Sequence, residues 1–342
     1  MVKRLILIAF IFVVLQCGFS RSADAQSYNG CLSTQVWYFP DPMPTGWFYY
    51  GPYPGTYAYL IAAWSYTCAP PDPGPGPGKE PCPHCPSAGK PISLSTGTTY
   101  IEQADVKIPG LGNGLNLVRT WISSWPSTQA ASQVGLFGPN WRSTYEEKIL
   151  LGSDGYTKYA RSDGSFWSFG LDAAASILRV AAPASVSATL AKSASNWTLT
   201  FQNGEQRQFD STTGNLIAII DRNGNTTQLS YDTSNRLATV TDAASRHMYF
   251  TYATSTSTLV TGVSSDAGPT LAYSYDVQGR LSQVTKPDQT TISFVYNAQS
   301  LISSVLDSSG KVLESHTYDG FGRGLTSSRA GGVEGLTITY PQ

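Results

Sequence analysis

Apolar and polar residues alternate with a period of two along most of the chain from Lys90 onward, and this alternation predicts β-strands. The segment "NWTLTFQNGEQRQF" has one such strand on each side of Asn203-Gly204, a dipeptide that favours a tight hairpin turn. Asp163-Gly164 separates two further strands in the same way. The Ala/Ser-rich stretch 171–195 has the composition for one short helix, which Pro183 opposes. The predicted fold class is therefore all-β.

The turns become periodic after residue 205. An aromatic residue, usually followed by Asp or Asn, recurs at successive spacings of 22, 21, 23, 21 and 22 residues. The six positions are Phe209-Asp210, Tyr231-Asp232, Tyr252-Ala253, Tyr275-Asp276, Tyr296-Asn297 and Tyr318-Asp319. So narrow a spacing indicates an internal repeat, in which each unit stacks on its neighbours.

The unit from Tyr275 to Tyr296 predicts its own local structure. Asp276 suits the first position of a type I turn, and Gly279 suits the left-handed position that completes the hairpin loop. Arg280 follows, and we expect it to pair with a nearby carboxylate or carbonyl. A short strand, a second turn at 286–288 and a returning strand complete the unit. Each unit is thus two strands and two turns.

The returning strands are predicted to share one largely apolar face, because side chains alternate along a strand. This inner face holds the repeat aromatics and the residues two and four positions before them: Leu229, Phe250, Tyr273, Phe294 and His316, and Thr227, Met248, Leu271, Ile292 and Glu314. A curved sheet with this face and its edges uncovered invites association. We therefore expect self-association, or a partner protein that completes a shell.

The repeats resemble the YD repeats of bacterial Rhs proteins, which are also found in teneurins. The likeness is clearest at "YDVQGRLSQVT", and the segment Gly89 to Trp121 resembles the domain that precedes the repeats in many Rhs proteins. The resemblance implies a β-sheet spiral that closes as a hollow shell. In polymorphic members, such a shell holds a C-terminal toxin and carries an aspartyl self-cleavage site near a D-P-x-G-L-type motif. No such motif occurs here, so the resemblance implies a short or truncated member.

The first residues predict export. A short basic segment, "MVKR", precedes an apolar run from Leu5 to Leu15, and small residues then lead to a cleavage site after Ala25. This is the pattern of a secretory signal peptide. Lipoprotein processing at Cys17 is the alternative, which Gln16 disfavours. After cleavage the chain is expected to be soluble in the periplasm, at the cell surface or outside the cell.

Four cysteines remain after cleavage, and in an oxidising compartment an even number favours disulfides. They are Cys31, Cys68, Cys82 and Cys85. Cys31 and Cys68 bracket an aromatic-rich module at 26–69, and their pairing is the preferred hypothesis. Its aromatics either form a small stapled core or stack on glycans; the candidates for stacking are Trp37, Trp47 and Trp64.

The Pro/Gly-rich segment 70–88 is predicted to be a linker. Cys82 and Cys85 lie within it as a CxxC pair around His84. A zinc site would need a second ligand pair, so a local or intermodule disulfide is the favoured interpretation.

Composition and motifs argue against most enzymes and against nucleic acid. Charged residues make up only 13% of the chain and the net charge is −1, which gives no basic surface for nucleic acid. The histidines, His84, His247 and His316, show no metal-ligand spacing. Glu146-Glu147 are adjacent carboxylates, and in a strand they would point to opposite faces. No enzyme activity and no cofactor are expected.

The predicted domains are a signal peptide (1–25), an aromatic Cys-bracketed module (26–69), a linker (70–88), an Rhs N-terminal-like β domain (89–205) and six YD repeats (206–342). The first functional hypothesis is an exported, non-enzymatic structural or interaction surface at the cell exterior. The alternatives are a truncated shell from a toxin-delivery or contact-dependent competition system, and a carbohydrate-binding surface protein.

Overall fold

The computed structural model describes residues 87–88, 92–93, 96–123, 134–152, 156–172, 177–182, 186–266, 268, 270–332 and 335–340. Almost all regular structure in these residues is β-strand, so the predicted all-β class is confirmed. The strands before the repeats are β1 (Ser87–Ala88), β2 (Ile92–Ser93), β3 (Tyr100–Ile108), β4 (Leu115–Ile122), β5 (Val134–Gly135), β6 (Gly138–Pro139), β7 (Trp141–Ser143), β8 (Lys148–Leu151), β9 (Thr157–Ala160), β10 (Phe166–Asp172), β11 (Ile177–Ala182), β12 (Ala188–Lys192) and β13 (Asn196–Phe201).

The strands of the repeats follow the same pattern to the end of the described chain. They are β14 (Gln206–Asp210), β15 (Leu216–Ile220), β16 (Thr226–Tyr231), β17 (Leu237–Thr241), β18 (His247–Tyr252), β19 (Val260–Ser265), β20 (Leu271–Tyr275), β21 (Leu281–Thr285), β22 (Thr291–Tyr296), β23 (Ile302–Leu306), β24 (Val312–Tyr318), β25 (Gly324–Arg329) and β26 (Leu336–Thr337). The described residues also include the 3₁₀ turns η1 (Leu111–Asn113) and η3 (Ala330–Gly332).

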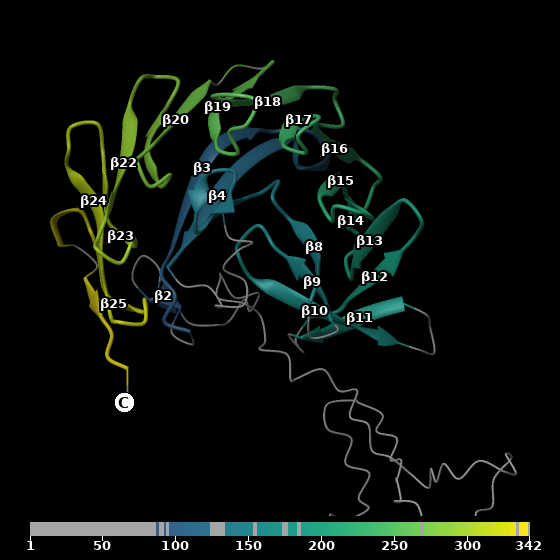
Figure 1. The fold of residues 1–342 in the computed structure, drawn as a ribbon, viewed down its shortest axis with the longest axis horizontal. Coiled ribbons are helices and arrows are strands. Elements are labelled where there is room, and N and C mark those ends of the chain that lie inside the picture. The colour runs from purple at the N-terminus through teal and green to yellow at the C-terminus, as the bar shows by residue number, and fades with distance from the viewer. Residues whose placement is uncertain are drawn as a thin grey trace, which may run out of the picture. The chain divides into compact units, whose positions relative to one another are not determined.

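Strands β8 to β26 pair one after another, each antiparallel to the next, in a single curved sheet (Figure 1). The register shifts by one residue just before each repeat aromatic, for example between Ser274 and Tyr275 and between Val295 and Tyr296. Such a β-bulge bends the strand and increases its twist. Because the bulge recurs in every unit, the sheet turns steadily in one direction.

The first strands of this sheet close into a small ring. Lys148 on β8 bridges to Asn215, which directly precedes β15, and the Ile149 amide donates to the Gly214 carbonyl at 2.9 Å. Aromatic side chains fill the ring: Tyr159 lies edge-on to Trp167 at 5.5 Å and to Phe209 at 5.8 Å between ring centroids. Stretch 171–195 therefore contributes β11 and β12 to the sheet, and the short helix considered there is not seen in its described residues.

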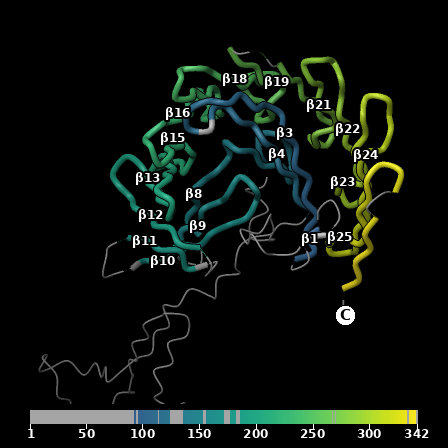
Figure 2. Tube along the Cα trace, turned by 180° about the vertical axis from the view of Figure 1, so that it is seen from behind, coloured from purple at the N-terminus to yellow at the C-terminus, as the bar shows by residue number. Residues whose placement is uncertain are grey.

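Strands β3, β4 and β7 form a separate sheet that runs along the inner side of the curved repeats (Figures 1 and 2). We call the described residues between positions 89 and 147 the inner domain. A strand rises about 3.3 Å per residue and neighbouring strands lie about 4.8 Å apart, so a nine-residue strand spans about six sheet strands. The contacts agree with this: Pro109 accepts a hydrogen bond from Arg246 before β18, and Ser123 donates to the Gly322 carbonyl before β25.

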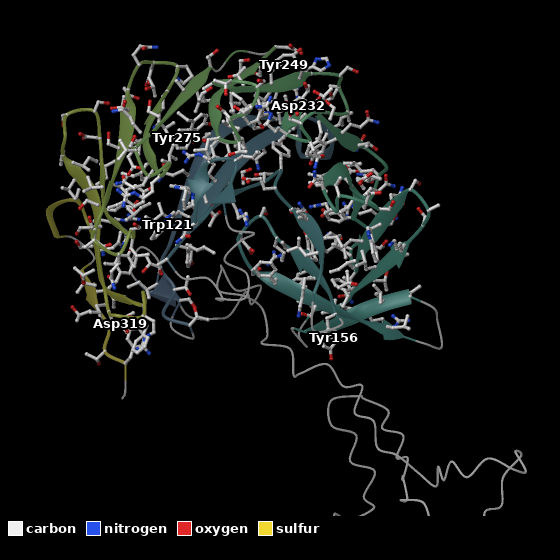
Figure 3. All side chains as sticks on the ribbon, viewed as in Figure 1. Trp121, Tyr156, Asp232, Tyr249, Tyr275 and Asp319 are labelled. Carbon is white, nitrogen blue, oxygen red and sulfur yellow. The ribbon has the colours of Figure 1, made fainter. Side chains whose placement is uncertain are left out.

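One aromatic of the inner domain meets each of four successive returning strands. The pairs are Tyr145–Phe250, Phe137–Tyr273, Trp141–Phe294 and Trp121–Tyr318, with ring centroids 4.8 to 6.4 Å apart. Figure 3 shows Trp121 on the inside of the curved sheet and Tyr249 on its outside. Phe250, Tyr273 and Phe294 are each no more than 6% exposed. The expectation that the inner face lies uncovered is therefore wrong, because the chain's own inner domain covers it.

Candidate functional site

The opening turns of four of the six repeats are each built around one aspartate. The Asp276 carboxylate accepts the backbone amides of Gln278 at 3.0 Å and Arg280 at 2.9 Å, and the Arg280 Nε at 2.6 Å. Gly279 adopts a left-handed φ of +74°. Burial acts to raise the pKa of Asp276, but the hydrogen bonds from Arg280 hold it below its usual value. The same arrangement recurs at Asp232–Arg236, Asp242–Arg246 and Asp319–Arg323.

Each repeat tyrosine fastens its unit to the preceding one. The Tyr296 hydroxyl donates to the Leu281 carbonyl at 2.8 Å, and burial raises the pKa of Tyr296 to about 12. The equivalent hydrogen bonds, all between 2.6 and 2.8 Å, are Tyr231 to Leu216, Tyr252 to Leu237, Tyr275 to Val260, Tyr318 to Ile302 and Tyr340 to Gly324. We call this series the tyrosine ladder. Phe209 holds the first position without a hydroxyl and is fully buried.

Tyr340 extends the ladder beyond the six units expected from the sequence. It lies 22 residues after Tyr318, a spacing that could have identified it, but Pro341 stands where the other units have Asp, Asn or Ala. The Arg323 guanidinium lies 4.2 Å from the Tyr340 ring centroid, as Arg236 and Arg280 lie over Tyr252 and Tyr296 at 4.3 and 4.5 Å. Each such arginine therefore joins the aspartate of its own turn to the tyrosine of the next unit.

A buried ion pair joins the inner domain to the repeats. Asp105 occupies the bulge of β3, where the register to β4 shifts, and Arg119 on β4 donates to it through Nε and, at 2.9 Å, through Nη2. The Tyr273 hydroxyl on β20 donates to the same carboxylate at 2.7 Å. Burial acts to lower the pKa of Arg119, but Asp105 outweighs it and raises that pKa.

Three aromatic rings enclose the Arg119 guanidinium. Its Cζ lies 4.7 Å from Trp141, 5.3 Å from Tyr273 and 5.4 Å from Phe137, measured to ring centroids. Arg119 is only 1% exposed. The sequence analysis did not identify Arg119 or Asp105, since their partners lie up to 168 residues away along the chain.

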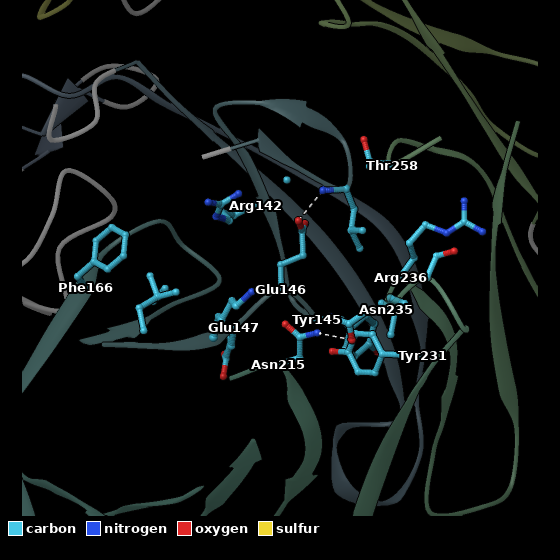
Figure 4. Close-up of a pocket in the computed structure, with 17 residues that line it drawn as sticks. Arg142, Tyr145, Glu146, Glu147, Phe166, Asn215, Tyr231, Asn235, Arg236 and Thr258 are labelled. Carbon is cyan, nitrogen blue, oxygen red and sulfur yellow. Dashed lines mark hydrogen bonds between the residues drawn. The ribbon is translucent and has the colours of Figure 1, made fainter. Parts of the chain in front are cut away.

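A pocket of about 410 Å³ lies between the inner domain and the β16–β17 turn (Figure 4). Glu146 reaches into it, and Glu146 Oε1 accepts the Leu136 amide at 2.6 Å while Oε2 has no hydrogen-bond partner among the described residues. Burial raises the pKa of Glu146, against the opposing effect of Arg142, and burial lowers the pKa of Arg142. Lys148 also lines the pocket, and burial lowers its pKa too. The pocket therefore brings carboxylate and cationic side chains to a space that can hold a small polar solute.

The two adjacent glutamates serve different partners. They lie in the connection between β7 and β8 rather than in a strand, which corrects the premise that strand alternation separates them. The Glu147 carboxylate accepts the Tyr159 hydroxyl at 2.7 Å and lies 3.3 Å from Arg207 Nε, whereas Glu146 contacts Leu136. The pair is thus no shared acid/base centre.

The histidines that the structure describes do not line this pocket. His247 is partly exposed, with Nδ1 2.6 Å from Asp266 Oδ2. His316 is buried, with Nε2 3.7 Å from Glu314 Oε2. Within the described ranges, no group of three or more His, Cys, Asp or Glu is arranged to hold a metal ion. No helix among the described residues is long and apolar enough to span a membrane.

The candidates before residue 86 lie outside the described residues. They comprise the cleavage site after Ala25, the cysteines Cys31, Cys68, Cys82 and Cys85, and the glycan-stacking candidates Trp37, Trp47 and Trp64. The disulfides and the stacking surface therefore stay predictions.

Two family models match the chain. Residues 89–169 match a domain of unknown function, DUF6531, and residues 210–247 and 257–291 match the RHS Repeat. The chain therefore contains RHS repeats preceded by a DUF6531 domain. The matched repeats contain β15–β17 and β19–β21, with Tyr231 and Tyr275 of the tyrosine ladder, and the DUF6531 match contains the inner domain from Gly89 to Glu147.

Solved structures with similarity to the chain come from Tc toxins. A crystal structure of TcdB2-TccC3-Cdc42 shows 14% identity and a TM-score of 0.28, over 67% of this chain and 14% of that one. A Tc holotoxin pore of Photorhabdus luminescens shows 15% identity and a TM-score of 0.27, over 68% and 10%. The chain thus spans only a small part of the length of these structures. Its fold is defined by the strand pairing described above. A search of curated proteins found no match.

Proposed function

We propose that this RHS-repeat protein is an exported, non-enzymatic structural and interaction surface at the cell exterior. The observation that carries this proposal is the covered inner face. Because the inner domain fills the concave side, contacts with other molecules fall to the outer side, which carries Ser and Thr along with exposed Tyr249 (39%) and Val295 (46%). The tyrosine ladder and the Arg119–Asp105 pair make this surface rigid.

Export is tested first with a tagged full-length chain. We expect the mature N-terminus at Gln26, and the tag should be digested by protease added to cells with a permeabilised outer membrane. An Ile8→Asp variant, which interrupts the apolar run, should keep the chain inside the cell. An unprocessed wild-type chain that stays protected from protease would contradict the export proposal.

The surface role is tested with purified protein and envelope fractions of neighbouring cells. A Tyr249→Ser, Val295→Ser double variant should lose retention on the fractions, since both side chains are exposed. Glu146→Gln should retain it, because Glu146 lies in the interior pocket. The non-enzymatic proposal fails if a correctly folded Glu146→Gln protein loses retention on the fractions while the double variant keeps it. The chemistry of the pocket would then be responsible for retention.

The second candidate is the front part of a toxin-bearing shell. Tyr340 favours it, because its hydrogen bond to the Gly324 carbonyl adds a further unit to the repeat register. Sequencing the transcript past codon 342 decides the matter. Further repeats, a D-P-x-G-L motif and a variable tail would support the toxin-shell proposal, whereas a stop followed by unrelated genes would remove it.

A further inference from the structure

A second pocket, of about 540 Å³, lies where the inner domain meets β14–β16. One wall is a cross-strand row on the repeat sheet, because Arg207 on β14 pairs with Ile219 on β15, and Ile219 pairs with Thr227 on β16. The opposite wall is the Gly-rich loop from Pro109 to Gly114. We call this space the loop pocket.

Thr227 is an unusual residue for its place. The same inner-face position carries Met248 and Leu271 in the next two units, and both are buried apolar side chains. Thr227 is only 2% exposed, and its hydroxyl has no hydrogen-bond partner in the described part of the chain. A buried hydroxyl without a partner is costly, so a buried threonine where the next two units carry apolar residues indicates a ligand that uses it.

Arg207 also has unused capacity toward the loop pocket. Its Nε lies 3.3 Å from Glu147 Oε2 but makes no hydrogen bond with it, while the Tyr159 hydroxyl donates to that same oxygen at 2.7 Å. The guanidinium rests over the Phe201 ring at 5.2 Å. Arg207 Nε is therefore within ion-pair distance of Glu147 but lacks a hydrogen bond of correct geometry.

The remaining lining makes the loop pocket polar and slightly cationic. Lys107, at the exposed mouth, and Arg207 oppose Glu147, the one carboxylate of the lining, while Glu205 Oε2 lies 3.9 Å from Arg207 Nη1 outside it. Ser162 and Thr144 add hydroxyls, although the Thr144 hydroxyl already accepts the Val118 amide at 3.0 Å. Two cations, one acceptor carboxylate and a free hydroxyl fit a ligand that carries both an anionic group and hydroxyls.

The Gly-rich loop leaves room for such a ligand. Gly112 and Gly114 have left-handed φ values of +63° and +61°, and a Cβ on Gly112 would come within 3.0 Å of Asn225. The loop therefore packs its backbone directly on the β15–β16 turn and brings no side chain from these positions into the space. A volume of about 540 Å³ falls in the range of small-molecule sites, which is about 300–1,000 Å³.

We propose that the loop pocket binds a small hydroxylated anion of the size of a sugar acid or a sugar phosphate. The anionic group lies toward Arg207 and Lys107, one ligand hydroxyl bonds Thr227, and Glu147 accepts from another. This site is separate from the outer surface that serves the proposed function, so either proposal can fail alone.

The test is calorimetric titration of the full-length purified chain with glucuronate, glucose 6-phosphate and neutral glucose. We expect one or both anions to bind and glucose to bind at least about tenfold more weakly. The two anions distinguish a carboxylate ligand from a phosphate ligand. Binding of neither anion at millimolar concentration would overturn the proposal.

Three variants separate binding from folding. Thr227→Val should weaken binding of the anion about tenfold. The midpoint of thermal unfolding should stay the same or rise, because the lost hydroxyl had no partner among the described residues. Lys107→Ala, at the mouth, should weaken binding and reduce its salt dependence. Lys286→Ala, an exposed lysine on a distant turn, is the matched control and should change nothing. Equal affinities in all three variants would show that the anion binds elsewhere.

Discussion

At the scale of single residues, the backbone conformation of a turn determines which residue types it accepts. Gly279 has φ +74° and its nearest potential Cβ contact is 3.8 Å away, so a methyl group fits but the left-handed backbone opposes it. Gly279→Ala should therefore cost about 1–2 kcal/mol of unfolding free energy. Urea denaturation measures this loss of unfolding free energy. Gly320→Ala is the control, because Gly320 lies in the equivalent turn with open space and no positive φ. This control substitution should be neutral or slightly stabilising. Equal losses in both variants would refute the backbone argument.

The tyrosine ladder makes a second residue-scale prediction. Tyr296→Phe removes the donor to the buried Leu281 carbonyl and leaves the ring in place over Arg280. We expect a loss of about 1–2 kcal/mol, since a buried acceptor loses its partner. Tyr249→Phe, the same change on the outer side, should cost less than about 0.5 kcal/mol. Denaturation midpoints that rank the two variants in the opposite order would contradict a stabilising role for the Tyr296 hydrogen bond.

At the scale of elements, the sequence predicts each hairpin better than the contacts between hairpins. The Asp-x-x-Gly turns and the alternating strands follow from residues within about five positions of one another, and the structure shows both at Asp276–Arg280. The bulge before each aromatic and the position of the inner domain depend on distant parts of the chain. In the sequence, Asp105 looks like an ordinary strand residue. Its role is visible only in the fold, which brings β3 next to β20.

The Arg119–Asp105 pair tests how the inner domain is attached. Arg119→Met should destabilise the protein by about 3–5 kcal/mol, because it leaves a buried carboxylate without its counter-ion. Adding Asp105→Leu should recover at least half of that loss, since both charges are then gone. Arg222→Met, at an exposed turn position, is the control. A double variant no more stable than Arg119→Met would mean that the pair does not act through charge burial.

At the scale of the whole molecule, the inner domain changes what the repeats can do. The sequence predicts an aromatic face that invites association, and the structure places that face against four aromatics of the same chain. Each such pair contributes about 0.5–1.5 kcal/mol beyond its buried area. Self-association therefore draws no support from this face, whereas Val277 and Phe321 at the turn tips are 96% and 82% exposed.

The repeated turn aspartates should also set how stability of the whole sheet depends on pH. Hydrogen bonds hold the pKa of Asp232, Asp242 and Asp319 below the unfolded value of about 3.9. An acid whose pKa is lower in the folded state binds fewer protons there, so its stabilisation is present above pH of about 4 and is lost as pH falls through the folded pKa. Because the turns recur, these losses add along the sheet.

A matched pair of variants isolates this effect. Asp242→Asn removes one titrating group and should make the fall in unfolding free energy between pH 5 and about 3 shallower than in the wild type. Asn297 holds in its unit the turn position that Asp232 and Asp319 hold in theirs, accepting the amides of Gln299 and Leu301, and Asn297→Asp should make the fall steeper. Urea denaturation at each pH gives both slopes. Identical slopes in all three proteins would show that acid sensitivity arises outside the turns, whereas opposite changes would show that each repeat adds its own titrating carboxylate to one cooperative sheet.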